Sequence, residues 1–256
     1  MGEIILMTKK KNGVFHLEIS HSPLNLLNQQ IRKELGDIFL DLQKSEELKT
    51  LIFGSFTTAF SAGADLKEFP LRFDPLIALD HGQNAHRMIL SLASLRRPVI
   101  AVLNGLCLGG GLELAMACGY RIATYETKMG LPEIKRGVWP GTGGIFLLER
   151  LVGSAHARRL LMSGKTISSE QALDLGLVDQ VVRKEDLNDV VMSLAQEFSC
   201  GPISSIDAIS TLLEHKFLTQ FSEHLNFELD LFVKAYQLPA AQEGNRAFFE
   251  KRSPNW

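Results

Sequence analysis

The chain has 256 residues, of which 45% are hydrophobic and 22% are charged, and this composition is typical of a globular protein with a sizeable core. Its 27 Lys and Arg residues against 29 Asp and Glu residues leave a formal net charge of −2. This near-neutral charge balance does not indicate nucleic-acid binding or a basic membrane-binding surface. We therefore expect this protein to recognise its partners at local sites.

The cysteines and histidines do not form a metal-binding or disulfide pattern. Cys107, Cys118 and Cys200 form no CxxC pair, and the seven histidines are scattered without an HExxH motif. The apolar run near the N-terminus, IILM, is too short for a signal peptide and is followed by lysines. We expect no metal, a reducing compartment, and a soluble cytoplasmic protein without membrane association.

Strand-like and helix-like segments alternate along the first two thirds of the chain. Apolar residues at helical spacing predict a helix within 24–42, which Asn28 is placed to cap, and a second helix within 75–95. The segments with strand character are residues 14–20, 50–55, 99–105, 120–124 and 178–182. This alternation predicts an α/β domain.

The apolar segment 98–120 is long enough to suggest a membrane span. Asn104, Glu113 and a run of three glycines interrupt it, and a carboxylate at mid-bilayer is unfavourable. A buried strand, a turn and a buried helix fit this segment better.

Beyond Lys184 the strand signals end and helical patterns take over. We expect a core domain over residues 1–195 and a C-terminal helical region over 196–256, with Gly201-Pro202 breaking the chain between two helices. The second of these helices carries an apolar stripe formed by Phe217, Phe221, Leu225, Leu229 and Phe232. Either the core of the same chain or a neighbouring subunit could cover this stripe.

The glycine clusters fail the spacing tests for nucleotide binding. A GxGxxG motif beginning at Gly109 would need glycine where Leu114 stands, and one beginning at Gly141 would need it at Phe146. Gly164-Lys165-Thr166 lacks the earlier glycine of a phosphate-binding loop, because Arg159 occupies that position. We therefore do not expect a dinucleotide or nucleoside triphosphate enzyme.

Four motifs remain, and they occur in a fixed order along the chain. They are SAGADLKE at 61–68, NGLCLGGGLELA at 104–115, GLPEIKRGVWPGTGG at 130–144 and SGKTISSEQALDLGLVDQVV at 163–182, followed by EGNRAFFEKR at 243–252. Together they resemble the enoyl-CoA hydratase/isomerase, or crotonase, superfamily, and most closely its enoyl-CoA hydratases. The resemblance implies a crotonase-like spiral of repeated ββα units with a C-terminal helical trimerisation region, assembled as a homotrimer or a dimer of trimers.

The resemblance also implies an oxyanion hole and two catalytic carboxylates. A thioester carbonyl that gains enolate charge needs preorganised donors, and the backbone N–H groups of Ala64 and Gly110 match the family's pair. Glu113 and Glu133 match its catalytic glutamates, and the N–H of Gly141 matches the position that helps to hold the reacting water.

Further contacts to the substrate follow from the same resemblance. The implied contacts to coenzyme A are Ala62, Ala64, Asp65, Leu66, Lys67 and Lys251, although simple exposure to solvent is an equal interpretation for both lysines. The implied acyl pocket contains Leu112 and Trp139, and Trp139 stands where smaller aliphatic residues are common in the family.

The expected function is reversible hydration of a trans-2-enoyl-CoA in fatty-acid or related acyl-CoA metabolism, such as β-oxidation. Glu113 would orient and deprotonate water while Glu133 delivers the α-proton. No separate cofactor is expected, since coenzyme A is part of the substrate. One alternative is a Δ3,Δ2-enoyl-CoA isomerase that uses Glu133 alone. Another, of a different class, is a non-catalytic protein that binds coenzyme A or RNA.

Overall fold

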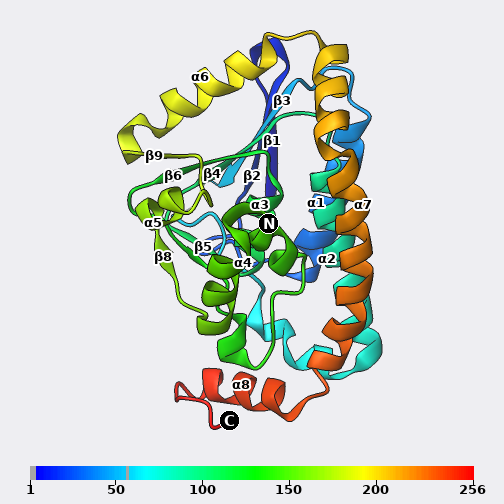
Figure 1. The fold of residues 1–256 in the computed structure, drawn as a ribbon, viewed down its shortest axis with the longest axis vertical. Coiled ribbons are helices and arrows are strands. Elements are labelled where there is room, and N and C mark those ends of the chain that lie inside the picture. The colour runs from blue at the N-terminus through cyan, green and yellow to red at the C-terminus, as the bar shows by residue number, and fades with distance from the viewer. Residues whose placement is uncertain (1–3, 56–57) are drawn as a thin grey trace.

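The computed structural model describes residues 4–55 and 58–256, and its core is built from two sheets (Figure 1). The larger sheet has the strand order β1-β2-β3-β4-β6-β9, and the smaller one has the order β5-β7-β8. The strands of the larger sheet are β1 (Ile5–Lys9), β2 (Val14–Ile19), β3 (Thr50–Ser55), β4 (Val99–Leu103), β6 (Tyr120–Thr124) and β9 (Gln180–Val182). The strands of the smaller sheet are β5 (Leu106–Leu108), β7 (Lys128–Gly130) and β8 (Ile167–Ser168). Residues 1–3 and 56–57, which fall within the predicted core domain, lie outside the described residues.

Helices cover both faces of the larger sheet (Figure 1). The α-helices are α1 (Gln29–Gln43), α2 (Pro75–Ala93), α3 (Gly110–Ala117), α4 (Gly144–Ser163), α5 (Ser169–Asp174), α6 (Leu187–Ser199), α7 (Ile203–Ala235) and α8 (Pro239–Phe249). Short 3-10 turns are η1 (Lys11–Gly13), η2 (Leu66–Glu68), η3 (Pro70–Phe73), η4 (Glu133–Arg136) and η5 (Lys184–Asp186). Helix α6 packs on one face of the sheet with Ile52, Ile100 and Ile122, while α1 to α4 and α7 enclose the main core on the other face.

The chain winds as a spiral because successive turns add a strand to each sheet. Strand β4 pairs with β6 in the larger sheet, and β5, which follows β4 directly, pairs with β7, which follows β6. The next turn contributes β8 to the smaller sheet and β9 to the larger one. All pairings in the larger sheet are parallel except that between β1 and β2. This is the spiral that the resemblance to the crotonase superfamily implied.

The predicted elements of the core are confirmed in type and place. The Asn28 side chain caps α1 by accepting a hydrogen bond from the backbone N–H of Ile31 at 2.9 Å. Helix α2 begins at Pro75 after the capping residue Asp74, whose carboxylate accepts from the N–H of Leu76. The segment 98–120 forms β4, β5 and α3, as expected for a buried strand, turn and helix. Within 4–55 and 58–256, no helix is both long and apolar enough to cross a membrane.

Helix α7 shares the main core, while its C-terminal end and α8 pack in a smaller cluster with Phe69 and Val138. Phe221 and Leu225 of α7 are buried in the same cluster as the sheet residues, and α7 packs along α2 (Figure 1). The apolar stripe of α7 is therefore covered in large part within its own chain. The predicted division between residues 195 and 196 falls inside α6.

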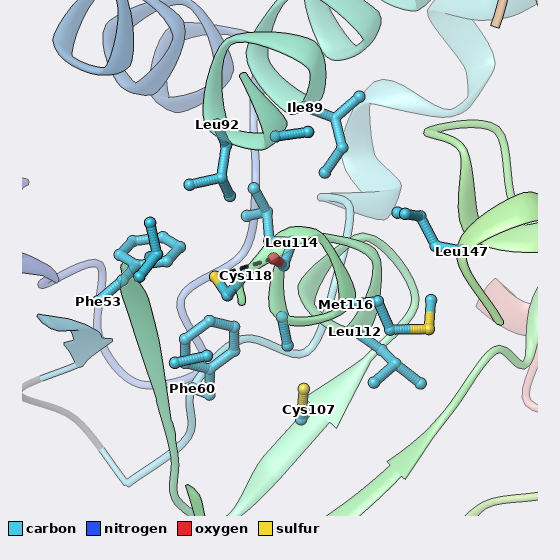
Figure 2. Packing of buried hydrophobic residues seen from close by; sticks show 14 of the residues in the cluster. Phe53, Phe60, Ile89, Leu92, Cys107, Leu112, Leu114, Met116, Cys118 and Leu147 are labelled. Atoms are coloured by element: carbon cyan, nitrogen blue, oxygen red, sulfur yellow. Dashed lines mark hydrogen bonds between the residues drawn. The ribbon is translucent and has the colours of Figure 1, made fainter. Parts of the chain in front are cut away.

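The centre of the core is the contact between α3 and the sheet. Figure 2 shows Leu112, Leu114 and Met116 of α3 surrounded by apolar side chains from β3, β5 and α2. Phe53 is fully buried there and makes edge-to-face contacts with Phe39 and Phe60, with ring centroids 5.7 and 5.5 Å apart.

We predict that Phe53→Ala lowers the free energy of unfolding by about 3–5 kcal/mol, because it removes both aromatic contacts and leaves a cavity. The matched control is Phe249→Ala at the end of α8, where the side chain is 53% exposed and the expected loss is below about 1 kcal/mol. Urea denaturation followed by circular dichroism measures both. Equal losses in the two variants would contradict this description of the core.

Candidate active site

The candidate site is a cavity between the start of α3, the loop after β3, and the helices α2 and α7. Its lining residues are Leu27, Arg32, Ala64, Leu66, Phe69, Arg72, His81, Ala85, Met88, Gly110, Glu113, Glu133, Arg136, Val138, Trp139, Gly141, Thr142, Phe232 and Tyr236. The cavity thus collects residues from nearly the whole length of the chain.

Two glycines let the loop after β3 approach the start of α3 closely. A Cβ atom at Gly63 would lie 2.8 Å from the carbonyl oxygen of Leu108, and one at Gly111 would lie 2.5 Å from that of Ser61. The approach is fixed by hydrogen bonds on both sides of Ser61: its N–H donates to Leu106, and its carbonyl accepts from Leu108. Any side chain at either glycine would push the two backbones apart.

This approach places two unpaired N–H groups on one cavity. Ala64 forms a parallel bridge with Leu27, in which the hydrogen bonds are made by the Gly63 carbonyl and the Asp65 N–H, so the N–H of Ala64 faces the other way. Gly110 is the first residue of α3, and an N–H at that position has no partner within its helix. Over the described chain neither N–H has an acceptor, and both residues line the cavity.

Glu113 is a buried carboxylate held in one orientation. The residue is 2% exposed, and its Oε1 accepts hydrogen bonds from the N–H groups of Thr142 and Gly144 at 2.8 and 2.9 Å. Burial, followed by the charges of Glu133 and Glu228, raises its pKa well above the ordinary carboxyl value despite these hydrogen bonds. The group is therefore fixed in place and disposed to hold a proton.

Glu133 is the second carboxylate of the cavity. It begins η4, and its Oε2 is buried without a hydrogen-bond partner in the described structure. Its Oε1 would lie 2.8 Å from a Cβ added at Gly109, so the carboxylate sits directly beside the start of α3. Burial raises the pKa of Glu133 to about 7. A carboxyl group with this pKa exchanges protons readily near neutral pH.

A third buried carboxylate, Glu228, supports the loop that holds Glu113. Its Oε1 accepts from the N–H of Gly143 at 2.8 Å and lies 3.0 Å from His86 Nε2, which also lies 3.1 Å from the Gly141 carbonyl. Burial raises the pKa of Glu228, but His224, His86 and the Gly143 N–H outweigh burial and lower it overall. The N–H of Gly141 has no acceptor among the described residues.

Sequence reasoning missed Glu228, although a signal for it was present. The residue lies on the stripe of α7 between Leu225 and Phe232, at the spacing that also buries Phe221. A lone carboxylate on a buried helix face requires partners, so it marks either a structural network or a site.

A cluster of polar side chains around Arg32 and Arg72, which the sequence analysis did not identify, lines another part of the cavity. Arg32 Nη1 donates to Glu68 Oε2 at 3.2 Å, and Arg72 Nη2 lies 3.7 Å from the same oxygen. Arg72 also donates to His81 Nδ1 at 3.1 Å and to the Tyr236 hydroxyl at 2.8 Å. Both arginines are 5% exposed.

The residues predicted to contact coenzyme A are divided by the structure. Ala64 and Leu66 line the cavity, whereas Lys67 and Lys251 are exposed and do not. Asp65 caps η2 by accepting from the N–H of Lys67 at 3.0 Å. The N–H of Ala62 donates to the Leu24 carbonyl at 2.9 Å, and Lys251 follows α8 with a φ of 53°.

Of the two predicted acyl-pocket residues, Trp139 lines the cavity and Leu112 does not. Leu112 is 1% exposed and packs in the main core (Figure 2). Successive residues of a helix point about 100° apart, so Leu112 and Glu113 point in different directions. A role for Leu112 in an acyl pocket therefore stays a prediction.

Comparison with known proteins identifies the family of the chain. The sequence model of the family described as enoyl-CoA hydratase/isomerase matches residues 9–256. The chain belongs to the enoyl-CoA hydratase/isomerase family. It therefore has the crotonase fold, and the similarity to enoyl-CoA hydratases covers nearly its whole length.

Individual relatives agree with this assignment to the enoyl-CoA hydratase/isomerase family. A probable enoyl-CoA hydratase of Bacillus subtilis is 35% identical over 244 residues, covering 94% of this chain and 93% of its own. A crotonyl-CoA hydratase of Syntrophomonas wolfei is 32% identical over 254 residues, covering 99% and 97%. An enoyl-CoA hydratase structure from Bacillus halodurans matches with a TM-score of 0.91 at 22% identity over 96% of this chain and all of its own, which supports the fold.

We predict that the stability of this family member depends on pH through Glu133. Its pKa is about 7 in the folded chain and 4.5 as an ordinary carboxyl, so the free energy of unfolding falls as the pH rises between these values. Glu133→Gln removes that titration. The free energy of unfolding of the variant minus that of wild type should therefore increase by about 1–3 kcal/mol between pH 4.5 and pH 8. Urea denaturation of both proteins at each pH measures this difference. A difference that does not change with pH would contradict the raised pKa.

Proposed function

We propose that this protein is an enoyl-CoA hydratase that adds water reversibly to a trans-2-enoyl-CoA thioester. The observation that carries the proposal is the pair of buried carboxylates, Glu113 and Glu133, on the cavity that the N–H groups of Ala64 and Gly110 also line. The names of the B. subtilis and S. wolfei relatives support the same reaction.

The two N–H groups supply the electrostatic part of the mechanism. The thioester carbonyl oxygen binds between the N–H groups of Ala64 and Gly110, and it gains negative charge when water adds to Cβ and an enolate forms. Gly110 begins α3, so the helix dipole adds to this stabilisation. Because the donors are part of the backbone, they need no reorganisation during the reaction.

The two carboxyl groups divide the proton transfers. Glu113, held by Thr142 and Gly144, orients the water and accepts its proton as the oxygen bonds to Cβ. The enolate then takes a proton at Cα from Glu133, which completes the hydration, and dehydration runs the same steps in reverse. The N–H of Gly141 holds the water. This division requires Glu113 to be ionised and Glu133 protonated when water adds. The charge of Glu133 is one of the causes that raise the pKa of Glu113, so protonation of Glu133 favours ionisation of Glu113.

Substrate binding and assembly complete the proposal. Backbone groups of Ala62, Ala64, Asp65 and Leu66 bind coenzyme A. Lys67 and Lys251 lie near its phosphates, and no separate cofactor is needed. The chain acts in the cytoplasm, in β-oxidation or related acyl-CoA metabolism, as a homotrimer or a dimer of trimers. Exposed apolar side chains on α7, among them Leu212 at 81% and Leu213 at 71%, support burial of this helix between subunits.

We predict that Glu113→Gln and Glu133→Gln each lower kcat for crotonyl-CoA hydration by about 10²–10⁴, because each removes one proton transfer. Loss of the ultraviolet absorbance of the enoyl thioester measures the rate. The control is Glu126→Gln on the exposed turn after β6, which should leave kcat unchanged. Calorimetric binding of coenzyme A confirms that each variant retains its site.

The same variants separate this proposal from its rivals. Isomerisation of a Δ3-enoyl-CoA that survives in Glu113→Gln, with no hydration by wild type, would indicate an isomerase that uses Glu133 alone. Coenzyme A binding without turnover of either substrate would indicate a non-catalytic protein. Salt-sensitive retention of RNA on a filter would indicate an RNA-binding protein.

A further inference from the structure

The cavity carries a cationic cluster that the hydration mechanism does not use. It consists of Arg32 on α1, Glu68 at the end of η2, Arg72 on η3, His81 on α2 and Tyr236 after α7. All but Glu68 line the cavity that also holds Glu113 and Glu133. The guanidinium of Arg72 additionally stacks on the rings of Tyr236 and Phe232, with 5.5 and 5.9 Å to their centroids.

The cluster contains more positive than negative charge. Two guanidinium groups share the single carboxylate of Glu68. Burial, followed by the charge of Arg72, lowers the pKa of His81, so the imidazole is neutral at neutral pH. The next carboxylate, Asp80, is exposed and accepts from Gln29 instead. One positive charge is therefore left without a counterion within the cluster.

The catalytic carboxylates do not supply that counterion. The pKa of Glu113 is set mainly by burial, Glu133 and Glu228, and that of Glu133 by burial, so neither guanidinium pairs with them. Burial and the like charge of Arg72 lower the pKa of Arg32 to about 10, which shows that the two cations oppose each other.

Part of the donor capacity of the cluster remains open toward the cavity. A guanidinium has five N–H donors. Arg72 uses Nε and Nη1 for His81 and Tyr236, while its Nη2 makes no hydrogen bond to the described residues. Arg72 Nη2 therefore keeps N–H donors without an acceptor in the part of the chain that the structure describes, and a charged N–H donor forms a strong hydrogen bond with a carboxylate.

We infer that the acyl group of the substrate ends in a carboxylate, so that the natural substrate is the monothioester of an enedioic acid. The inference rests on the proposed function, since it assigns the far end of an acyl chain whose thioester lies at Ala64 and Gly110. The distal carboxylate accepts a hydrogen bond from Arg72. Its negative charge balances the one positive charge by which Arg32 and Arg72 exceed the carboxylate of Glu68. An apolar acyl end would leave that buried charge unpaired, which is costly.

The test measures binding with saturated acyl groups, which cannot be hydrated. Calorimetry compares glutaryl-CoA with pentanoyl-CoA and adipyl-CoA with hexanoyl-CoA, so that each pair differs only in the terminal carboxylate. Wild type should bind the carboxylated member of at least one pair about tenfold or more tightly than its neutral partner. Equal binding in both pairs, or tighter binding of the neutral members, would overturn the inference.

Variants assign the preference to the cluster. Arg72→Met should reduce it about tenfold and change binding of the neutral member by less than about threefold. Arg72→Lys should retain part of it, because the charge remains. The control, Arg87→Met, removes a charge from the exposed face of α2 and should leave the preference intact. A preference that persists in both Arg72→Met and Arg32→Met would place carboxylate recognition elsewhere and overturn the inference.

Failure of the inference differs from failure of the proposed function. Hydration of pent-2-enoyl-CoA and its carboxylated counterpart at equal rates by a chain without a binding preference would overturn only the inference. Tight, Arg72-dependent binding of glutaryl-CoA without hydration of any enoyl-CoA would overturn the proposed function and keep the carboxylate subsite.

Discussion

The structure of the site depends on the close contact between the loop after β3 and the start of α3. This contact turns the N–H groups of Ala64 and Gly110 toward one cavity, and it is possible only because Gly63 and Gly111 carry no side chains. The remaining parts of the site are arranged around it: Glu133 reaches over Gly109, and the loop before α4 holds Glu113. The glycine run is thus a requirement for backbone proximity rather than a nucleotide-binding motif.

The site is assembled at a cost to stability. Glu113 and Glu133 are desolvated and carry raised pKa values, so ionising either one works against the fold. The compensation comes partly from α7, where Glu228 accepts from the Gly143 N–H and contacts His86. Helix α7 belongs to the region that the sequence predicted to mediate oligomerisation, and it also lines the candidate site of its own chain through Phe232.

Much of the fold could be predicted from the sequence because its longer elements carry a clear period. The strand at 14–19 alternates, and the helices at 29–43 and 187–199 have one apolar face. Strands β5, β7 and β8 are two or three residues long, too short to show a period. The two glutamates and the paired N–H groups followed from family motifs, not from periodicity.

The cationic cluster could not be predicted in the same way. Arg32, Glu68, Arg72 and Tyr236 lie on separate elements, and each alone has the character of an exposed polar residue. Only the packing of α1, α2 and α7 brings them together and buries them. The burial of Leu112 in the main core also depends on packing, because a motif position does not fix the direction of a side chain on α3.

The most direct test of the account is the infrared carbonyl stretch of butyryl-CoA labelled with carbon-13 at the thioester and bound to the protein. If the N–H groups of Ala64 and Gly110 polarise the carbonyl, its frequency falls below that of the free thioester in water. Gly111→Ala, whose Cβ would lie 2.5 Å from the Ser61 carbonyl, should lose most of that shift. An unshifted band in the wild-type complex would contradict the central claim that this backbone contact builds an oxyanion hole.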